Sequence, residues 1–494
     1  MTRELGDVIP VPGLVRPDPA ADFTIGSGTA VRTEPGTETV ADYLAGVLRA
    51  PTGFALPVSG SGSGSGSGAI VLLLDGGLGA DAYRLEVTPT GVTLTGGDPA
   101  GLFHGVQTLR QLLPAEALAS TRQDAVWTVP GGLIEDRPRF AYRGIMLDVA
   151  RHFFGVDDVK SFVDAIVLFK LNHLHLHLTD DQGWRLEIDS WPKLTALSGG
   201  EGTGVDGVGP GFYTKAEYAE IVAYAAERFV TVVPEIDLPG HVNAAQVAYP
   251  ELTADGVAPQ PRTDMAVGYS SLVAGKEETY AFVADVLREV AELTPGPYLH
   301  IGGDEAQATT AEDYKLLLGR VLPMVVALGK RPVGWHEMAA VDLPPEAVVQ
   351  FWRIEATDEN TARAAAAGTK VIMSPADRAY IDMKYTADDR LGLDWAGLLP
   401  VERAYGWDPA DRLPGVGEES LLGVEAPLWS ETLRSRADVQ AMVFPRIGAI
   451  AEIAWSAREG RDWESFRGRL AGWAPRWRHQ GVAFHPDPAI AWRD

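Results

Sequence analysis

Two adjacent carboxylates, Asp304 and Glu305, follow a short apolar strand and two glycines, and such a pair could work as a general acid beside a charged partner. The stretch reads Tyr298-Leu299-His300-Ile301-Gly302-Gly303-Asp304-Glu305. Strict strand geometry would point neighbouring side chains to opposite faces, but the glycines free the backbone so that both acids can face one pocket. Two carboxylates held this close cannot both ionise freely, so one should keep its proton near neutral pH. A solvated acidic loop is the ordinary alternative for an isolated Asp-Glu pair.

The composition is that of a folded protein with a large core. The chain has 494 residues, 46% of them hydrophobic and 22% charged, which suggests about two or three domains. A net charge of −25 argues against nucleic acid and anionic membranes as partners. The absence of cysteine excludes disulfides, thiol nucleophiles and Cys-metal sites. No apolar signal core opens the sequence and no run reaches transmembrane length, so we expect a cytoplasmic protein unless a signal has been trimmed.

Residues 1–136 are expected to form a separate, smaller α/β domain. The predicted strands are Phe23–Ile25, Ile70–Leu74, Tyr83–Val87 and Val92–Thr95, and one helix is predicted over Gly101–Leu113. The pure Ser-Gly alternation of Ser59–Gly68 cannot pack a core, and we expect a flexible surface loop there. Pro138 disfavours helix at the residue before it and marks the domain boundary.

Residues 137–494 alternate between apolar strands and amphipathic helices. The eight predicted strands are Gly144–Val149, His173–Leu178, Thr231–Ile236, Tyr298–Ile301, Pro332–Trp335, Val348–Trp352, Lys370–Met373 and Leu422–Leu428. The predicted helices are Val156–Lys170, Lys215–Phe229, Glu277–Leu293, Ala311–Leu328, Asn360–Ala367 and a final helical region over Ala437–Trp455. This alternation predicts an α/β fold, a (β/α)8 barrel that carries the catalytic site.

In such a barrel the chemistry lies where strands end and loops begin, and those positions are polar here. In chain order the ends carry Asp148, Arg151 and His152; Thr179-Asp180-Asp181; Glu235 through His241; Asp304-Glu305; Trp335-His336-Glu337; Trp352-Arg353; Tyr380, Asp382 and Trp395; and Trp429-Ser430-Glu431. Because such residues recur at strand ends all around the predicted barrel, they predict a polar pocket walled by aromatic side chains.

The histidines His173, His175 and His177 alternate along one strand and share a face, so a metal site is one interpretation. They are embedded between leucines and the later strands lack a clear ligand set, so a structural role is favoured. His241 follows Pro-Gly at a strand end and is either a structural histidine or a hydrogen-bond partner of Asp180 or Glu305.

Five motifs together resemble the family 20 glycoside hydrolases, the β-N-acetylhexosaminidases. They are His300 to Glu305, Leu147-Asp148-Val149-Ala150-Arg151-His152, His175 to Asp181, Glu235-Ile236-Asp237-Leu238-Pro239-Gly240-His241 and Trp429-Ser430-Glu431. The N-terminal unit also looks like the α/β domain that precedes the barrel in this family, through Gly105-Val106-Gln107-Thr108-Leu109. The resemblance therefore covers nearly the full chain.

The resemblance implies a retaining mechanism in which the 2-acetamido group of the substrate, not an enzyme carboxylate, attacks the anomeric carbon. Glu305 would be the general acid and later the base. Asp304 would orient the acetamido N–H and stabilise its positive charge, and its own charge would raise the proton affinity of Glu305. Tyr380 would hydrogen-bond the acetamido oxygen.

The remaining residues carried over from the family would bind the sugar. Arg151, Asp382 and Glu431 would hold its outer hydroxyls, and a supporting polar group would consist of Asp180, His241 and Asp237. The acetamido group and the ring would be enclosed by Trp335, Trp352, Trp395 and Trp429. No metal and no cofactor is expected, and the expected partner is a small carbohydrate such as a chitooligosaccharide or a glycan end.

Three other functions stay open at this point: a metal-dependent barrel hydrolase, a non-catalytic glycan-binding protein, and a glycosidase that works without acetamido assistance. The natural glycan, the choice between N-acetylglucosamine and N-acetylgalactosamine, and the oligomeric state are not determined by the sequence.

Overall fold

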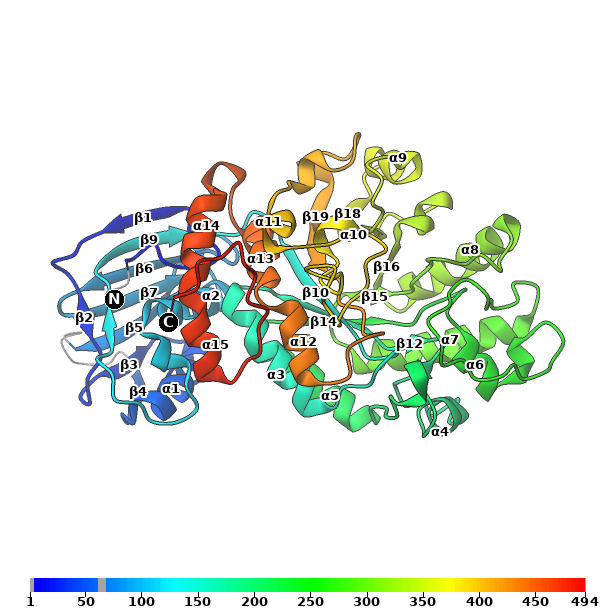
Figure 1. The fold of residues 1–494 in the computed structure, drawn as a ribbon, viewed down its shortest axis with the longest axis horizontal. Coiled ribbons are helices and arrows are strands. Elements are labelled where there is room, and N and C mark those ends of the chain that lie inside the picture. The colour runs from blue at the N-terminus through cyan, green and yellow to red at the C-terminus, as the bar shows by residue number, and fades with distance from the viewer. Residues whose placement is uncertain (1–3, 61–67, 494) are drawn as a thin grey trace.

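The computed structural model describes residues 4–60 and 68–493. Its N-terminal part holds a mixed seven-stranded sheet in the order β1-β9-β6-β7-β5-β3-β4 (Figure 1). In that order, the strands are Leu14–Pro17, Gly132–Asp136, Tyr83–Thr88, Gly91–Gly96, Ala69–Leu74, Ala30–Thr33 and Val58–Gly60. All four strands predicted here are present, with β2 covering Phe23–Thr24.

Two helices accompany this sheet. Helix α1 (Glu38–Thr52) was not predicted, whereas α2 (Pro99–Leu112) agrees with the prediction to within two residues at each end. Twelve of the fourteen α2 residues are buried, because the helix packs against β6 and β7 and also contacts Val167–Phe169 of the second unit. Gln111 of α2 donates to the backbone oxygen of Leu168 at 2.7 Å, which ties the sheet to the second unit.

The loop predicted over Ser59–Gly68 is wrong at its first two residues. Ser59 and Gly60 belong to β4 and pair with Arg32 and Thr33 of β3, because the strand that starts at Val58 continues its hydrogen-bond ladder into the Ser-Gly run. Residues 61–67 of that run lie outside the described residues.

The second unit is a closed barrel of eight parallel strands, which confirms the predicted fold class. In order around the barrel the strands are β10 (Tyr142–Asp148), β11 (His173–His177), β14 (Thr231–Glu235), β15 (Tyr298–His300), β16 (Arg331–Trp335), β17 (Val348–Phe351), β18 (Lys370–Met373) and β19 (Leu421–Ala426). The outer helices include α3 (Val156–Ile166), α5 (Lys215–Ala226), α7 (Glu277–Leu293), α8 (Ala311–Ala327) and α9 (Glu359–Ala366). Each strand therefore delivers its C-terminal end to the same rim.

The predicted helical region over Ala437–Trp455 is two helices, α12 (Arg436–Val443) and α13 (Arg446–Trp455). The break falls at Phe444-Pro445, because proline lacks the N–H that would continue the helix. After α13 come α14 (Trp463–Leu470) and α15 (Ala474–Gln480), on the side of the barrel unit nearest the N-terminal sheet (Figure 1), and α15 packs against Ala115–Leu118, the short segment after α2. Arg476 of α15 donates to the Gln111 oxygen at 2.6 Å, so the end of the chain packs on the N-terminal sheet unit.

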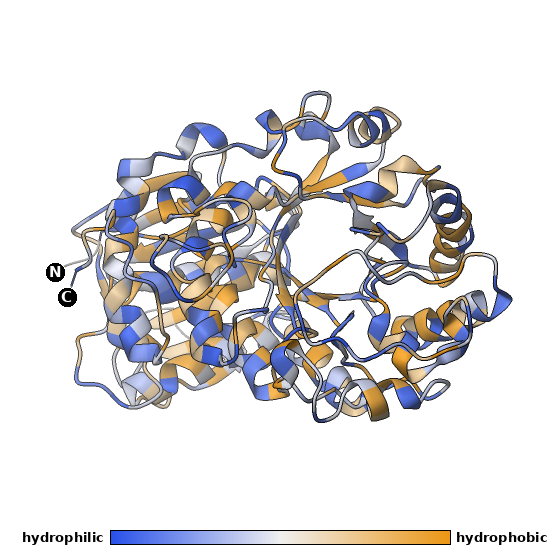
Figure 2. Cartoon of the chain, turned by 45° about the vertical axis from the view of Figure 1, so that its right-hand side comes forward, coloured by the Kyte–Doolittle hydropathy of each residue, from blue (hydrophilic) through white to orange (hydrophobic). Residues whose placement is uncertain are grey.

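Polar and apolar segments alternate along the helices around the barrel, whereas the strands are mostly apolar (Figure 2). This is the pattern of helices that cover a core with one face. Among the described residues, no helix is both long and apolar enough to cross a bilayer.

Candidate active site

A cavity of about 460 Å³ opens at the rim where the barrel strands end. Its volume falls in the range of small-ligand sites. The lining residues come from loops far apart in the sequence: Arg151, Met265, Val267, Asp304, Glu305, Trp352, Tyr380, Asp382, Leu393, Trp395, Trp429 and Glu431. Nine of the thirteen residues assigned to the site from the sequence line it, and Asp180, Asp237, His241 and Trp335 do not.

The loop that carries the acidic pair is held in a conformation that few residues tolerate. Gly302 has φ of 66°, and a Cβ there would lie 1.7 Å from the Asp237 Oδ1 atom. The same Asp237 oxygen accepts from the Gly303 N–H at 3.2 Å. Glu305 itself has φ of 45°, a strained value for a residue with a side chain. Strain of this kind concentrates at functional sites.

The two acids differ in exposure. The Asp304 side chain is 10% exposed and that of Glu305 is 31% exposed. His241 stands beside both, with its Nε2 atom 3.7 Å from Asp304 Oδ2 and 3.5 Å from Glu305 Oε2. Its other ring nitrogen, Nδ1, is hydrogen-bonded to Asp180 Oδ1 at 3.1 Å, and Arg151 pairs with Asp180 Oδ2 at 2.8 Å. The histidine therefore links a buried carboxylate to the acidic pair.

Burial raises the pKa of the Asp304 carboxyl to about 7, against the opposing charge of His241, and the charges of Glu337 and Glu305 add to the rise. Asp304, the more deeply buried acid of the pair, is thus one whose pKa lies near neutral pH. Asp237, buried next to Asp304, also has a raised pKa, caused first by burial and then by the Asp304 charge.

Aromatic rings wall one side of the cavity. Trp352 packs edge-on against Trp395 at 6.0 Å, and Tyr380 lies 5.9 Å from Trp395 and 6.3 Å from Trp429 between ring centroids. Trp395 is 49% exposed. Trp335 is completely buried, does not line the cavity and packs behind Trp429 at 5.9 Å. Its indole N–H donates to Glu235 Oε1 at 3.0 Å instead.

The far end of the cavity is charged. Arg151 lies over the Trp429 ring at 4.9 Å, with Asp382 and Glu431 in the same wall. Burial raises the pKa of Glu431 to about 7 while the Arg151 charge opposes the rise. Burial also raises the pKa of Asp382, and the neighbouring Glu431 charge raises it further. Buried carboxyls of this kind fit the hydroxyl groups of a polar ligand.

Three lining residues were missed: Met265, Val267 and Leu393. Met265 and Val267 are 51% and 39% exposed, and no strand end or motif marks their segment, so only their apolar character in a polar loop could have drawn attention. Glu337 was placed at a strand end but given no role. Its carboxylate accepts from the Trp352 indole N–H at 3.2 Å.

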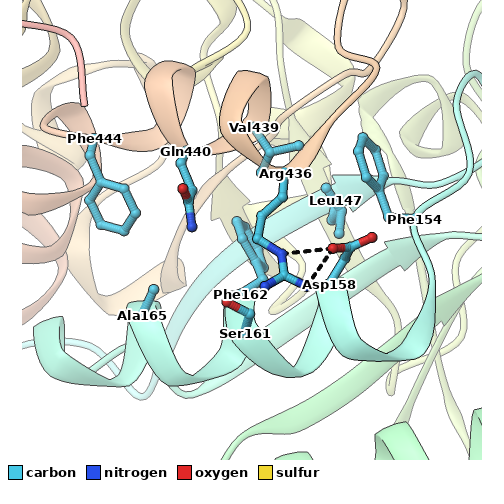
Figure 3. Close-up of a pocket in the computed structure, with 10 residues that line it drawn as sticks. All are labelled: Leu147, Phe154, Asp158, Ser161, Phe162, Ala165, Arg436, Val439, Gln440 and Phe444. Atoms are coloured by element: carbon cyan, nitrogen blue, oxygen red, sulfur yellow. Dashed lines mark hydrogen bonds and ion pairs between the residues drawn. The ribbon is translucent and has the colours of Figure 1, made fainter. Parts of the chain in front are cut away.

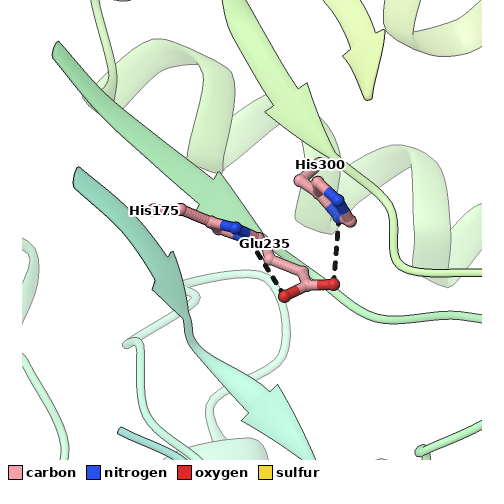
Figure 4. A group of neighbouring side chains, drawn as sticks. All are labelled: His175, Glu235 and His300. Atoms are coloured by element: carbon pink, nitrogen blue, oxygen red, sulfur yellow. Dashed lines mark ion pairs between the residues drawn. The ribbon is translucent and has the colours of Figure 1, made fainter. Parts of the chain in front are cut away.

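Two of the three histidines of β11, His175 and His177, contact carboxylates, whereas His173 is hydrogen-bonded to Asn172. His175 Nε2 and His300 Nδ1 approach Glu235 oxygens at 3.0 and 2.9 Å (Figure 4), and His177 Nδ1 approaches the same carboxylate at 2.5 Å. These groups could hold a metal ion by proximity, but each of the three rings already faces a carboxylate. The structural interpretation therefore stays our prediction.

A second cavity between α3 and α12 is too small for a sugar. It lies beside the Arg436–Asp158 ion pair (Figure 3) and measures about 20 Å³, which is close to the space one water molecule needs.

Comparison with known proteins identifies relatives across the whole chain. The glycosyl hydrolase family 20 catalytic-domain model matches residues 140–317 and 308–458, and the model of that family's domain 2 matches residues 6–137. A beta-N-acetylhexosaminidase of Cellulomonas fimi is 43% identical over 491 residues, which cover 98% of this chain and 97% of the relative.

Solved structures agree. The family 20 beta-N-acetylhexosaminidase of Streptomyces coelicolor A3(2) superposes with a TM-score of 0.95 at 50% identity, covering 99% of both chains. A mutant Streptomyces plicatus beta-hexosaminidase in complex with its product, GlcNAc, superposes with a TM-score of 0.96 at 50% identity, covering 99% of this chain and 98% of that one.

Proposed function

The chain belongs to glycosyl hydrolase family 20 and is a β-N-acetylhexosaminidase, and from that premise we propose that it removes terminal, non-reducing β-linked N-acetylglucosamine by a retaining, substrate-assisted mechanism. Chitooligosaccharides and N-acetylglucosamine-ended glycans are the proposed substrates.

The observation that carries this proposal is the Asp304 carboxylate beside Glu305. Its Oδ1 atom is buried and finds no hydrogen-bond partner within residues 4–60 and 68–493. A buried acceptor without a partner is costly, and a substrate N–H placed there would remove the cost. Glu305, one residue away and more exposed, can reach the glycosidic oxygen above it.

In the proposed reaction, the acetamido oxygen attacks the anomeric carbon while the glycosidic bond breaks. Glu305 gives its proton to the departing oxygen, and an oxazolinium ion forms. Glu305 then removes a proton from water as the water oxygen attacks the anomeric carbon. This attack opens the oxazolinium ring, restores the acetamido group and leaves the anomeric carbon with its original configuration.

The nucleophile is tethered to the sugar, so little orientational entropy is lost in the attack. As the acetamido group becomes positive, an ionised Asp304 stabilises it more strongly, which favours the transition state over the ground state. We infer that the acetamido N–H and the growing positive charge draw Asp304 into its ionised form, against the raised pKa that burial gives it. Tyr380 would donate to the acetamido oxygen and aim it at the anomeric carbon.

The pocket geometry favours the end of a glycan. Arg151, Asp382 and Glu431 stand together in its wall and would bind the outer hydroxyls, which leaves no room for a further sugar on that side. Trp352, Tyr380, Trp395 and Trp429 would enclose the acetamido group and stack on the ring.

The test compares nitrophenyl β-N-acetylglucosaminide with the matching β-glucoside, each with and without a chelator. Chelator-resistant turnover of the acetamido substrate alone is the expected result. Equal turnover of both substrates would remove the acetamido group from the mechanism, and loss of activity with chelator would favour a metal-dependent hydrolase. The corresponding galactosaminide, run in parallel, measures selectivity at the 4-hydroxyl.

A further inference from the structure

Beneath the cavity, carboxylates and histidine rings alternate through the interior of the barrel. Tyr142 donates to Glu425 at 2.5 Å, and the Glu425 Oε1 atom lies 2.9 Å from His175 Nδ1. The other nitrogen of His175, Nε2, lies 3.0 Å from Glu235 Oε2, and that oxygen lies 2.5 Å from His177 Nδ1. These contacts join strands β10, β19, β11 and β14, and the side chains of all five residues are almost completely buried.

The row continues to the catalytic pair. His177 Nε2 lies 2.8 Å from Asp180 Oδ2. The other oxygen of Asp180, Oδ1, lies 3.1 Å from His241 Nδ1, and His241 Nε2 faces Glu305 and Asp304 at 3.5 and 3.7 Å. We call this series of six contacting residues the buried row: Glu425, His175, Glu235, His177, Asp180 and His241.

The partners of the two inner rings fix their protonation. Both nitrogens of His177 are hydrogen-bonded to carboxylate oxygens, which can only accept, so this ring satisfies its contacts as a doubly protonated imidazolium. In His175, Nδ1 is hydrogen-bonded to Glu425, while Nε2 lies 3.0 Å from Glu235 Oε2 without hydrogen-bond geometry. In agreement, the Glu425 and Glu235 charges raise the pKa of His175 to about 9 against the effect of burial. The charges of Glu235 and Asp180 hold the pKa of His177 well above its ordinary value.

We propose that Glu235 is a positioning residue of the reaction, which acts through a charged His177 to hold Asp180, and thereby aims a charged His241 at Asp304 and Glu305. Glu235 does not line the cavity. The row is the chain of contacts that leads from it to the acidic pair, and its charge also acts on Asp304 directly and raises the pKa of that carboxyl. The inference rests on the proposed roles of Asp304 and Glu305.

Other charged or titratable groups face the row and influence its protonation. They are Arg151, paired with Asp180; Asp181, 3.8 Å from His241; Asp237, whose charge acts on His241; and His300, 2.9 Å from Glu235. Of these, only Arg151 lines the cavity.

Two variants of the full chain remove charge from the row. His177→Gln deletes the positive charge between Glu235 and Asp180. Glu235→Gln deletes the carboxylate that keeps the second proton on His177, so it removes one negative charge together with the positive charge of His177 and leaves the net charge of the row nearly unchanged. His177→Gln removes only the positive charge next to Asp180, which makes the site more negative and raises the proton affinity of Asp304 and Glu305. Both limbs of the kcat/KM profile against pH should therefore move to higher pH by about half a unit to one unit in His177→Gln, and by less in Glu235→Gln.

Two controls separate this effect from damage to the fold. His173→Gln changes another buried histidine of β11, which stacks on Tyr142 at 3.9 Å and lies outside the row. It should leave the limbs where they are. Glu235→Asp keeps the charge and should also keep the limbs, even at lower activity. Because limb positions do not depend on the fraction of active enzyme, partial unfolding does not imitate the shift.

The wild-type enzyme provides a test that needs no folded variant. With 15N-labelled histidine, nuclear magnetic resonance of the 10 rings should show three buried imidazoliums, His175, His177 and His241, at pH 7. A neutral His177 at that pH, or limbs that move equally in His173→Gln and His177→Gln, would overturn the proposal. Failure of the proposed function is seen separately, as equal wild-type turnover of the acetamido and hydroxy substrates.

Discussion

Replacing Asp304 with asparagine should stabilise the fold at neutral and alkaline pH while it removes activity. The Asp304 carboxyl has an ordinary pKa of 3.8, which burial raises to about 7 in the folded protein. Between those values the folded state holds a proton that the unfolded state has lost. The free energy of unfolding therefore falls as pH rises through this range, and the loss is complete above about pH 7.

The shift of about three units corresponds to about 4 kcal/mol if it belongs to Asp304 alone. Asp237 lies in the same buried group and its pKa is raised by the Asp304 charge, so the two carboxyls share the effect and we assign Asp304 roughly half, about 2 kcal/mol. Asparagine resembles the protonated acid in shape and cannot ionise. The variant should therefore match the wild type at pH 4.5 and exceed it at pH 8.

The assay is thermal unfolding of both proteins at these two pH values. We expect the difference in Tm, variant minus wild type, to rise by roughly 2 °C or more from pH 4.5 to pH 8. Glu305→Gln is the matched control, because the adjacent side chain is 31% exposed and its charge is partly solvated. A Tm difference that stays constant with pH, or a variant less stable at pH 8, would refute the burial argument. In parallel, kcat should fall more than KM rises, since Asp304 is proposed to act mainly in the transition state.

Three further predictions concern the acid, the tyrosine and the barrel interior. Glu305→Gln should slow substrates with poor leaving groups by about 100-fold or more and activated aryl glycosides less; equal losses on both would contradict its role as the acid. Tyr380→Phe should lower kcat by roughly 10-fold for the acetamido substrate, since one hydrogen bond to the acetamido oxygen is lost; an unchanged kcat would place Tyr380 outside the reaction. The pKa of His175 is raised from 6.5 to about 9 in the folded protein. Its charged ring therefore contributes stability that is fully present below about pH 6.5 and is lost as pH rises through 9. Tm of the wild type should therefore fall over that range, and His175→Gln should be less stable at pH 6.5 with a flatter dependence.

Local sequence patterns were sufficient for the barrel. Each strand is a short apolar run, each following helix has one apolar face, and the polar residues stand at the strand ends. The acidic pair was also predicted from local sequence, because two glycines after a strand allow both of the following acids to face one pocket. Helix α1 was missed although Val40, Leu44 and Leu48 already mark its buried face with helical spacing.

Other features depend on contacts between residues far apart in the chain. Which acid of the pair has the raised pKa depends on burial and on Glu337 from another loop. Trp335 and Trp429 both stand at or just after the end of a barrel strand. Trp429 lines the cavity, whereas Trp335 is buried behind it and donates its indole N–H to Glu235. Met265 and Val267 line the cavity although they belong to the segment before α7, away from every strand end.

The sequence by itself determined the family, the barrel and most of the residues around the cavity, because these follow from residue types and their spacing. The tertiary structure alone decided protonation and depth. A histidine flanked by leucines reads as core in the sequence, but His177 becomes a charged link once Glu235 and Asp180 close on its two nitrogens. Solvent exclusion and long-range charge set these properties, and neither is written in local sequence.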